Sequence, residues 1–217
     1  MKNVFKVIKE LVVLSKFYAC VSVILSFGIP AFCWQALKDS GSVAIMVAFS
    51  FLATPSFMFF MFFGKVDLVE DKCKQMTYLL LTPLTRTQYV AAKYVLTCVI
   101  FVLSIVGYLV VGLFLKDLPD ITMGGIAYDV LLYVIFTGVY IPLELKFGYE
   151  AVKFYPMVMF MLASFGGVLG IKLLLQTFDD SIFESLDKLS PVAIVLSVVL
   201  FCASFLVSRK VYETKDL

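Results

Sequence analysis

Long apolar runs alternate with short polar segments along the chain. A transmembrane helix needs about 20 predominantly apolar residues, and six stretches are long and apolar enough to qualify. The predicted spans cover residues 17–37, 42–64, 94–115, 124–143, 154–175 and 191–208. An even number of spans puts both termini on the same side. The pattern therefore predicts an all-α, polytopic membrane protein with six transmembrane helices.

The composition agrees with this class of protein. Hydrophobic residues make up 62% of the 217 residues and charged residues 16%, whereas a soluble domain is closer to half apolar and a quarter charged. One compact core cannot hold this excess, so much of it must face lipid. Histidine, the commonest metal ligand and general base, is absent. There is also no GxxxxGK[ST] phosphate loop, GxSxG elbow or HExxH motif. We therefore expect no catalytic residue, metal site or cofactor in this chain.

The basic residues predict the orientation. With the N-terminus in the cytoplasm, the outer side holds only Lys38, Lys116, Lys172 and Lys188 of the 18 lysines and arginines. This asymmetry follows the positive-inside rule. We expect both termini in the cytoplasm, with residues 17–217 forming the six-span domain.

Residues 1–16 precede the first span and show a helical period. Val4, Phe5, Ile8, Leu11 and Val12 fall on one face, and the lysines fall on another. This pattern is typical of an amphipathic helix in the headgroup layer. A simple positive flank that orients the first span would explain the lysines but not the apolar period.

The segment 65–93 is polar but patterned. Pro83 disfavours helix at Thr82, so a helix through residues 76–81 should end there. Thr85 then starts a second helix, with Gln88 completing a capping box. Leucines at positions 79–81 would stand at the tip of this helix–turn–helix elbow, where exposed apolar residues suggest docking onto a partner. The alternative is an elbow that folds back on the bilayer and only connects two spans.

Two stretches resemble the ABC-2 type exporter permeases. "TPLTRTQYVAAKYV" is similar to the family's "LPvsR…iV…KY" segment after the second span. The matching residues are Pro83, Arg86, Val90, Lys93 and Tyr94. "IPLELKFGYEAVKFYP" is similar to the "P…fkfGyekar" segment of a small six-span subfamily, with matches at Pro142, Lys146, Gly148, Tyr149 and Glu150. The chain departs from the two patterns at Thr82 and at Val152-Lys153.

The resemblance implies a permease subunit in the cell membrane of a bacterium. It would pair with a second permease chain and with two copies of an ATP-binding subunit, which carry the ATP and Mg. The subfamily resembles membrane subunits of Gram-positive exporters for phenol-soluble modulins and other antimicrobial peptides, which implies amphipathic or hydrophobic peptide cargo. No nucleic acid is expected as a partner.

The same resemblance implies which residues contact the ATP-binding subunit. The main contact would come from the elbow: Met76, Leu79, Leu80, Leu81, Pro83, Leu84 and Arg86. A smaller contact would come from the second stretch: Lys146, Gly148, Glu150 and Lys153.

Two other functions remain open. One is a non-transporting immunity or sensor protein of the same fold. The other is a secondary carrier, which would be expected to contain buried charged pairs and an internal repeat. The spans show neither clearly.

Three further features carry expectations. Gly166 and Gly170, with Ala163 and Gly167 in parallel, let helices approach closely, either within one subunit or between two permeases. Asp129 lies near the outer end of the fourth span, and we favour an interfacial carboxylate over a cavity-lining one. Residues 176–190 contain a Ser181/Glu184 capping box and predict a short amphipathic helix on the outer leaflet.

Overall fold

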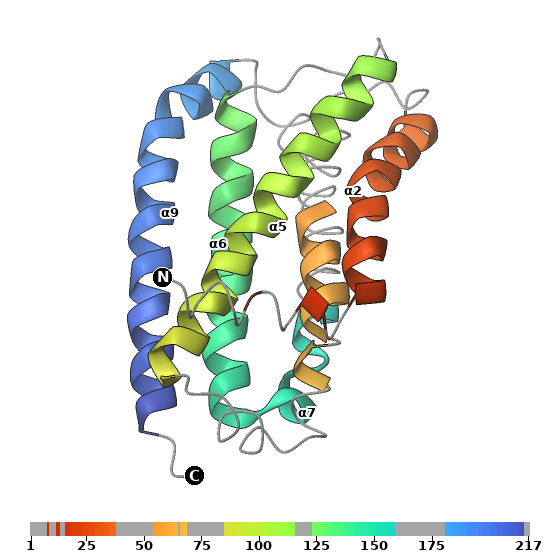
Figure 1. Ribbon diagram of the computed structural model, residues 1–217. Helices are drawn as coiled ribbons and strands as arrows, with labels where there is room; N and C mark the ends of the chain where they lie inside the picture. Colours follow the sequence, from red (N-terminus) through yellow and green to blue (C-terminus); the bar gives the residue numbers. More distant parts are fainter. Residues whose placement is uncertain are drawn as a thin grey trace.

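Helices form all the regular structure in the described part of the chain (Figure 1). The computed structural model describes residues 8, 12–13, 16–37, 54–64, 66–68, 85–115, 123–158 and 181–214. The labelled helices are α2 (Lys16–Leu37), α5 (Arg86–Phe114), α6 (Met123–Phe147), α7 (Tyr149–Val152) and α9 (Ser181–Glu213). Residues 54–64 and 66–68 are also helical. These residues confirm the all-α prediction for the part of the chain that they cover.

Three of the described helices are long and apolar enough to cross a membrane. They are Arg86–Phe114, Gly124–Phe147 and Leu189–Glu213. Apart from Leu115, they contain the predicted spans 94–115, 124–143 and 191–208, so the chain is a multi-pass membrane protein. The span predicted at 17–37 is helical as α2, which includes a shorter apolar stretch at Lys16–Phe32. Much of the remaining two spans lies outside the described residues, and the total of six stays a prediction.

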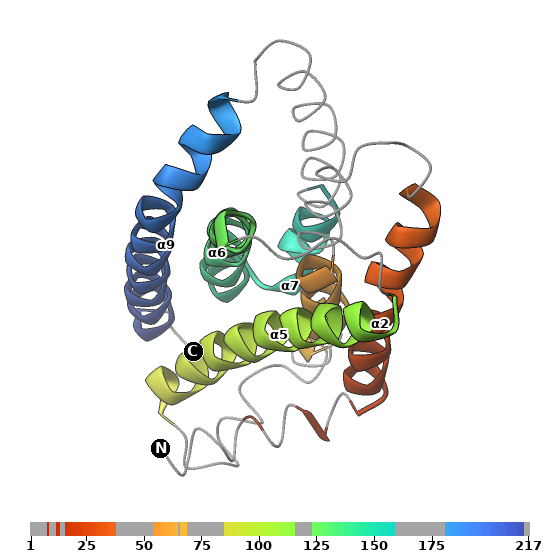
Figure 2. The ribbon, with the colours of Figure 1, turned by 90° about the horizontal axis from the view of Figure 1, so that it is seen from above.

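The helices form an open bundle in which α6 and α9 lie side by side (Figures 1 and 2). Helix α5 crosses this pair at a tilt: it begins beside the end of α9 and finishes beside α2. It contacts both α2 and α9. We call the end of the bundle where α5 begins and where α6 and α9 finish the base.

An aromatic core joins the helical segment 54–64 to α6. Phe59 stacks on Phe63 and meets Tyr133, Phe136 and Tyr140 edge-on. All five side chains are buried. The outward face of α9 is apolar but exposed, as expected for a surface that contacts lipid rather than water.

Two helix boundaries differ from the predicted ones. Helix α9 runs without a break from Ser181 through Pro191, so residues 181–190 continue into the last span instead of forming a separate helix. Its first turns lie at an angle to the rest (Figures 1 and 2), and a proline inside a helix favours such a bend because it removes a backbone hydrogen bond. Helix α6 continues through Pro142 to Phe147, so the second motif begins inside a helix and not in a loop.

Two other predicted segments are described only in part or not at all. Ile8 and Val12, from the predicted amphipathic start, are helical and pack against the core. The proposed small-residue packing face lies outside the described residues, namely Ala163, Gly166, Gly167 and Gly170.

Gly107 allows α5 to approach α2 closely. A Cβ atom at this position would lie 2.5 Å from the backbone oxygen of Ser26, and backbone atoms cannot move aside without separating the helices. We expect Gly107→Ala to destabilise the protein by about 1–3 kcal/mol, the usual cost of overpacking. Thermal unfolding in detergent measures the effect. Gly28→Ala on α2 is the matched control, because its added Cβ meets nothing within 4 Å. Equal unfolding midpoints for the two variants would contradict the prediction.

Candidate functional site

The capping box predicted at the start of α5 is present. Thr85 Oγ1 accepts a hydrogen bond from the Gln88 backbone N–H, and the Thr85 N–H donates to Gln88 Oε1. These reciprocal bonds satisfy two backbone donors that a helix start leaves open. The helix therefore begins at a defined point within the predicted elbow, directly after its turn.

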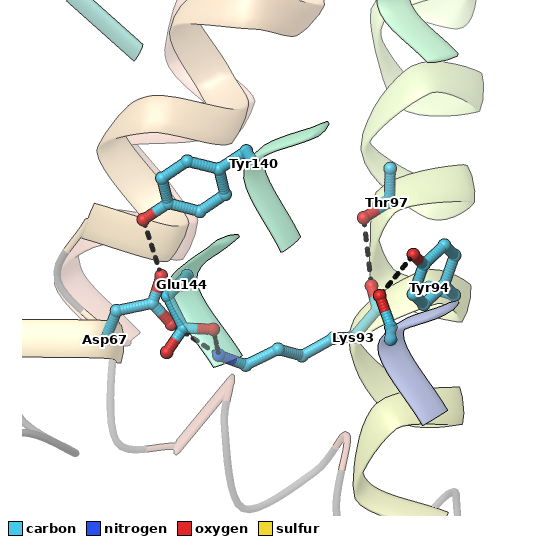
Figure 3. Close-up of polar contacts among 7 residues, drawn as sticks. Asp67, Lys93, Tyr94, Thr97, Tyr140 and Glu144 are labelled. Carbon is cyan, nitrogen blue, oxygen red and sulfur yellow. Dashed lines mark hydrogen bonds and ion pairs between the residues drawn. The ribbon is translucent and has the colours of Figure 1, made fainter. Parts of the chain in front are cut away.

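A buried ion cluster forms around Lys93, about two turns of helix after the capping box at the start of α5, and Figure 3 shows its side chains. Lys93 Nζ lies 2.7 Å from Asp67 Oδ1 and 2.8 Å from Glu144 Oε2, and none of the three side chains is more than 1% exposed. Asp67 belongs to the helical segment 66–68, and Glu144 belongs to α6. The lysine thus connects three elements that are distant in the sequence.

Tyr140 extends the cluster. Its hydroxyl donates a 2.7 Å hydrogen bond to Asp67 Oδ2 (Figure 3), and its ring packs in the aromatic core. Charges taken out of water are tolerated only when they are paired and hydrogen-bonded, and removal of one partner is costly. The cluster therefore fixes the position of α5 relative to α6 and to residues 66–68.

Tyr94 makes the corresponding connection to α9. Its hydroxyl lies 2.5 Å from Ser204 Oγ and 2.8 Å from Ser208 Oγ. Ser204 in turn donates to the backbone oxygen of Gly138 on α6, at 2.7 Å. Adjacent residues of α5 therefore hold different neighbours, since Lys93 faces α6 and residues 66–68 whereas Tyr94 faces α9.

Arg86 binds the end of α9. Its Nη1 donates to the backbone oxygens of Tyr212 (3.3 Å) and Glu213 (3.0 Å), and Thr87 donates to Glu213 Oε1 (3.2 Å). The last carbonyls of a helix carry partial negative charge and have no partner within the helix. Tyr89 also stacks on Tyr212. The guanidinium predicted to contact another subunit thus caps a helix of its own chain.

The second motif folds at the same end of the bundle. Gly148 separates α6 from α7 and has φ of 83°, a conformation that glycine adopts readily. Lys153 Nζ lies 2.6 Å from Glu150 Oε2, and this hydrogen bond raises the pKa of Lys153. Partial burial, followed by the nearby Asp67 carboxylate, raises the pKa of Tyr149. The exposed Lys146 lies in the last turn of α6.

Several predicted site residues cannot be placed. Met76, Leu79, Leu80, Leu81, Pro83 and Leu84 lie outside the described residues, so docking through the elbow tip stays a prediction. Asp129 is placed on α6 and is only 6% exposed. Both the interfacial and the cavity-lining interpretation of this carboxylate stay predictions. Among the described residues no group of three or more His, Cys, Asp or Glu side chains is placed to hold a metal ion.

Sequence reasoning missed Asp67 and Glu144. The predicted spans were expected to show no clear buried charged pair, and Asp67, Lys93 and Glu144 lie one to three residues beyond those spans, where they pair inside the bundle. Each was assigned to a polar connection between spans, where a charged residue needs no explanation. One signal in the sequence could have indicated that Lys93 is buried. Lys93 follows Val90 by three residues and Tyr89 by four, so all three lie on one face of a continuous helix. Val90 and Tyr89 are buried, so this face points inward.

The chain was compared with known proteins. A family model described as ABC-2 family transporter protein matches residues 7–213. Comparison with curated proteins and with solved structures gives no significant match. The match includes every residue of the base described above.

Proposed function

Because the chain belongs to the ABC-2 family of transporter proteins, we propose that it is the permease subunit of an exporter for amphipathic or hydrophobic peptides. The family is a membrane transport component that normally works with an ATP-binding subunit. In this proposal two such subunits hydrolyse ATP with Mg, and a second permease chain completes the pathway.

The observation that carries the proposal is the anchored base of α5. The elbow at 65–93, proposed to dock on the ATP-binding subunit, contains Thr85 and the first turns of α5. Arg86 and Tyr94 join this part of α5 to α9, and Lys93 joins it to α6. A displacement of the elbow would therefore move three helices together, which is what coupling of ATP hydrolysis to transport requires.

The charges at the base support the proposed orientation. Arg86, Lys146, Lys153, Arg209 and Lys210 all lie at this end of the bundle, beside the start of α5 or the ends of α6 and α9. Basic residues concentrate on the cytoplasmic side of membrane proteins. We therefore propose that the base faces the cytoplasm, where an ATP-binding subunit can reach it.

The proposed cargo follows from the chemistry of the chain. Phe and Met are abundant, at 22 and 9 residues. Apolar surfaces of this kind suit apolar or amphipathic cargo, because a strongly hydrated solute would lose water without polar replacements. Flexible Met side chains also let one surface accept varied partners.

A secondary carrier is the second candidate, and the buried ion cluster favours it. Ionisable residues inside membrane helices often mark ion or proton pathways. Such a carrier would move its substrate in response to an ion gradient without an ATP-binding subunit.

Reconstitution into vesicles tests the proposal. With an ATP-binding subunit that co-purifies with the chain, we expect amphipathic helical peptides to stimulate ATP turnover severalfold and a sugar to have no effect. The chain alone is expected to hydrolyse no ATP, because it has no phosphate loop. Transport driven by a proton or sodium gradient in the absence of ATP would favour the carrier instead. Stimulation by the sugar and not by peptides would contradict the proposed cargo.

A further inference from the structure

A basic pocket of about 430 Å³ opens between α6 and α9 at the base. Its lining residues are Lys146, Val207, Lys210, Val211 and Thr214. Lys146 lies in the last turn of α6, and Lys210 lies in the last turn of α9. The ends of these two helices lie side by side (Figures 1 and 2).

Two acidic residues at the base already have partners. Glu213 pairs with Arg209 at 2.8 Å, and Glu150 pairs with Lys153 at 2.6 Å. In the described structure neither Lys146 nor Lys210 forms an ion pair with an acidic side chain. A lysine in the last turn of a helix complements the helix dipole. This effect accounts for the position of each lysine separately, but it does not account for both lysines lining one pocket. Among the described residues, the pocket thus combines two positive charges without an acidic side chain paired to either.

The pocket continues into an apolar stripe on α9. Val207 forms part of its wall and is 52% exposed. At 3.6 residues per turn, Val199 and Val192 lie within about a quarter turn of Val207 around α9, and each is more than half exposed. This stripe runs along a helix apolar enough to cross the membrane. A matching ligand is therefore anionic at the base and apolar toward the membrane interior.

We propose that this pocket binds the headgroup phosphate of an anionic phospholipid, with one acyl chain along the valine stripe of α9. A phosphate near Lys146 and Lys210 gains charge-assisted hydrogen bonds, and basic pockets between transmembrane helices are suited to anionic headgroups. The lipid would contact α6 and α9 together at the end where Arg86 also holds α9. The proposal concerns the purified chain and does not depend on the cargo or on ATP.

Native mass spectrometry of the chain in neutral detergent tests this site. We expect tighter binding of phosphatidylglycerol than of phosphatidylcholine. In Lys146→Gln/Lys210→Gln that preference should fall at least about tenfold, because each basic residue at a membrane surface strengthens binding of an anionic lipid about fivefold. The charge-matched control is Lys153→Gln/Arg209→Gln, which removes two ion-paired cations at the same end and should retain the preference. Unfolding midpoints of both variants in detergent verify that they are folded.

Three results would overturn the proposal. The first is an unchanged preference in Lys146→Gln/Lys210→Gln. The second is equal competition by soluble glycerol phosphate, which would mean a free anion site without a role for the valine stripe. The third is loss of ATP-binding-subunit co-purification in that variant with lipid preference intact, which would make the pocket a protein contact. If Lys146→Gln/Lys210→Gln fails to fold, Lys210→Gln alone is measured in the same way, with an expected loss of about fivefold.

Discussion

Lys93→Met is expected to destabilise the protein by about 3–5 kcal/mol, the usual cost of removing one partner from a buried ion pair. The substitution keeps a side chain of similar length but leaves the carboxylates of Asp67 and Glu144 together in a buried site. Both would have lost the ammonium that offsets their removal from water. Thermal unfolding in detergent, followed by size-exclusion chromatography of the surviving protein, measures the loss.

Two further variants make the result specific to the cluster. Lys153→Met breaks an ion pair at the same end of the bundle, but that pair is exposed, so the effect should be small. The triple variant Asp67→Asn/Lys93→Met/Glu144→Gln removes all three charges and should recover much of the lost stability, because no buried charge remains unpaired. If Lys93→Met unfolds at the same temperature as Lys153→Met, the cluster does not stabilise the base.

The parts of the fold that the sequence predicted correctly depend on local chemistry. The capping box at Thr85 and Gln88 involves residues three positions apart, and its side chains are the ones that a helix start requires. The helices at 86–114, 123–147 and 189–213 follow from the length of each apolar run. Such features can be predicted from a short stretch of sequence because all the residues that form them lie within that stretch.

The ion cluster and the cap on α9 could not be predicted in this way. Arg86 meets the carbonyl of a residue 126 positions later, and Lys93 meets Glu144 51 positions later. An apolar run shows that a helix crosses the membrane but not which helix lies beside it. Asp67 and Glu144 also stand near the ends of their helices, where charged residues commonly reach water. Only the packing of the bundle shows that these carboxylates are buried.

The structure also gives the first motif a physical basis. Arg86, Val90, Lys93 and Tyr94 lie at helical intervals on α5, and each contacts a different part of the bundle. Arg86 caps α9, Val90 is fully buried in the core, Lys93 joins the ion cluster, and Tyr94 reaches the serines of α9. The resemblance had assigned Arg86 to a contact with the ATP-binding subunit. Its position suggests instead that it transmits movement from the elbow to α9.

These two roles predict different results for Arg86→Ala. A contact residue would be needed for subunit binding, whereas a transmitting residue would be needed only after binding. We expect the variant to co-purify with the ATP-binding subunit at the normal ratio. Peptide-stimulated ATP turnover should fall about tenfold, equivalent to ~1.4 kcal/mol of activation free energy, because the end of α9 loses both hydrogen bonds from Arg86 and keeps the one from Thr87.

Two comparison variants complete this experiment. Leu80→Arg places a charge at the proposed docking tip and should abolish co-purification. Leu80→Arg would then lose subunit binding, whereas Arg86→Ala would lose only the stimulation of ATP turnover. Arg209→Ala removes an exposed arginine from the same end, where its ion-pair partner among the described residues is Glu213 of its own helix, and should change turnover little. Loss of subunit binding in Arg86→Ala would return Arg86 to the contact surface. Normal binding together with normal turnover would mean that the α5–α9 cap has no part in coupling.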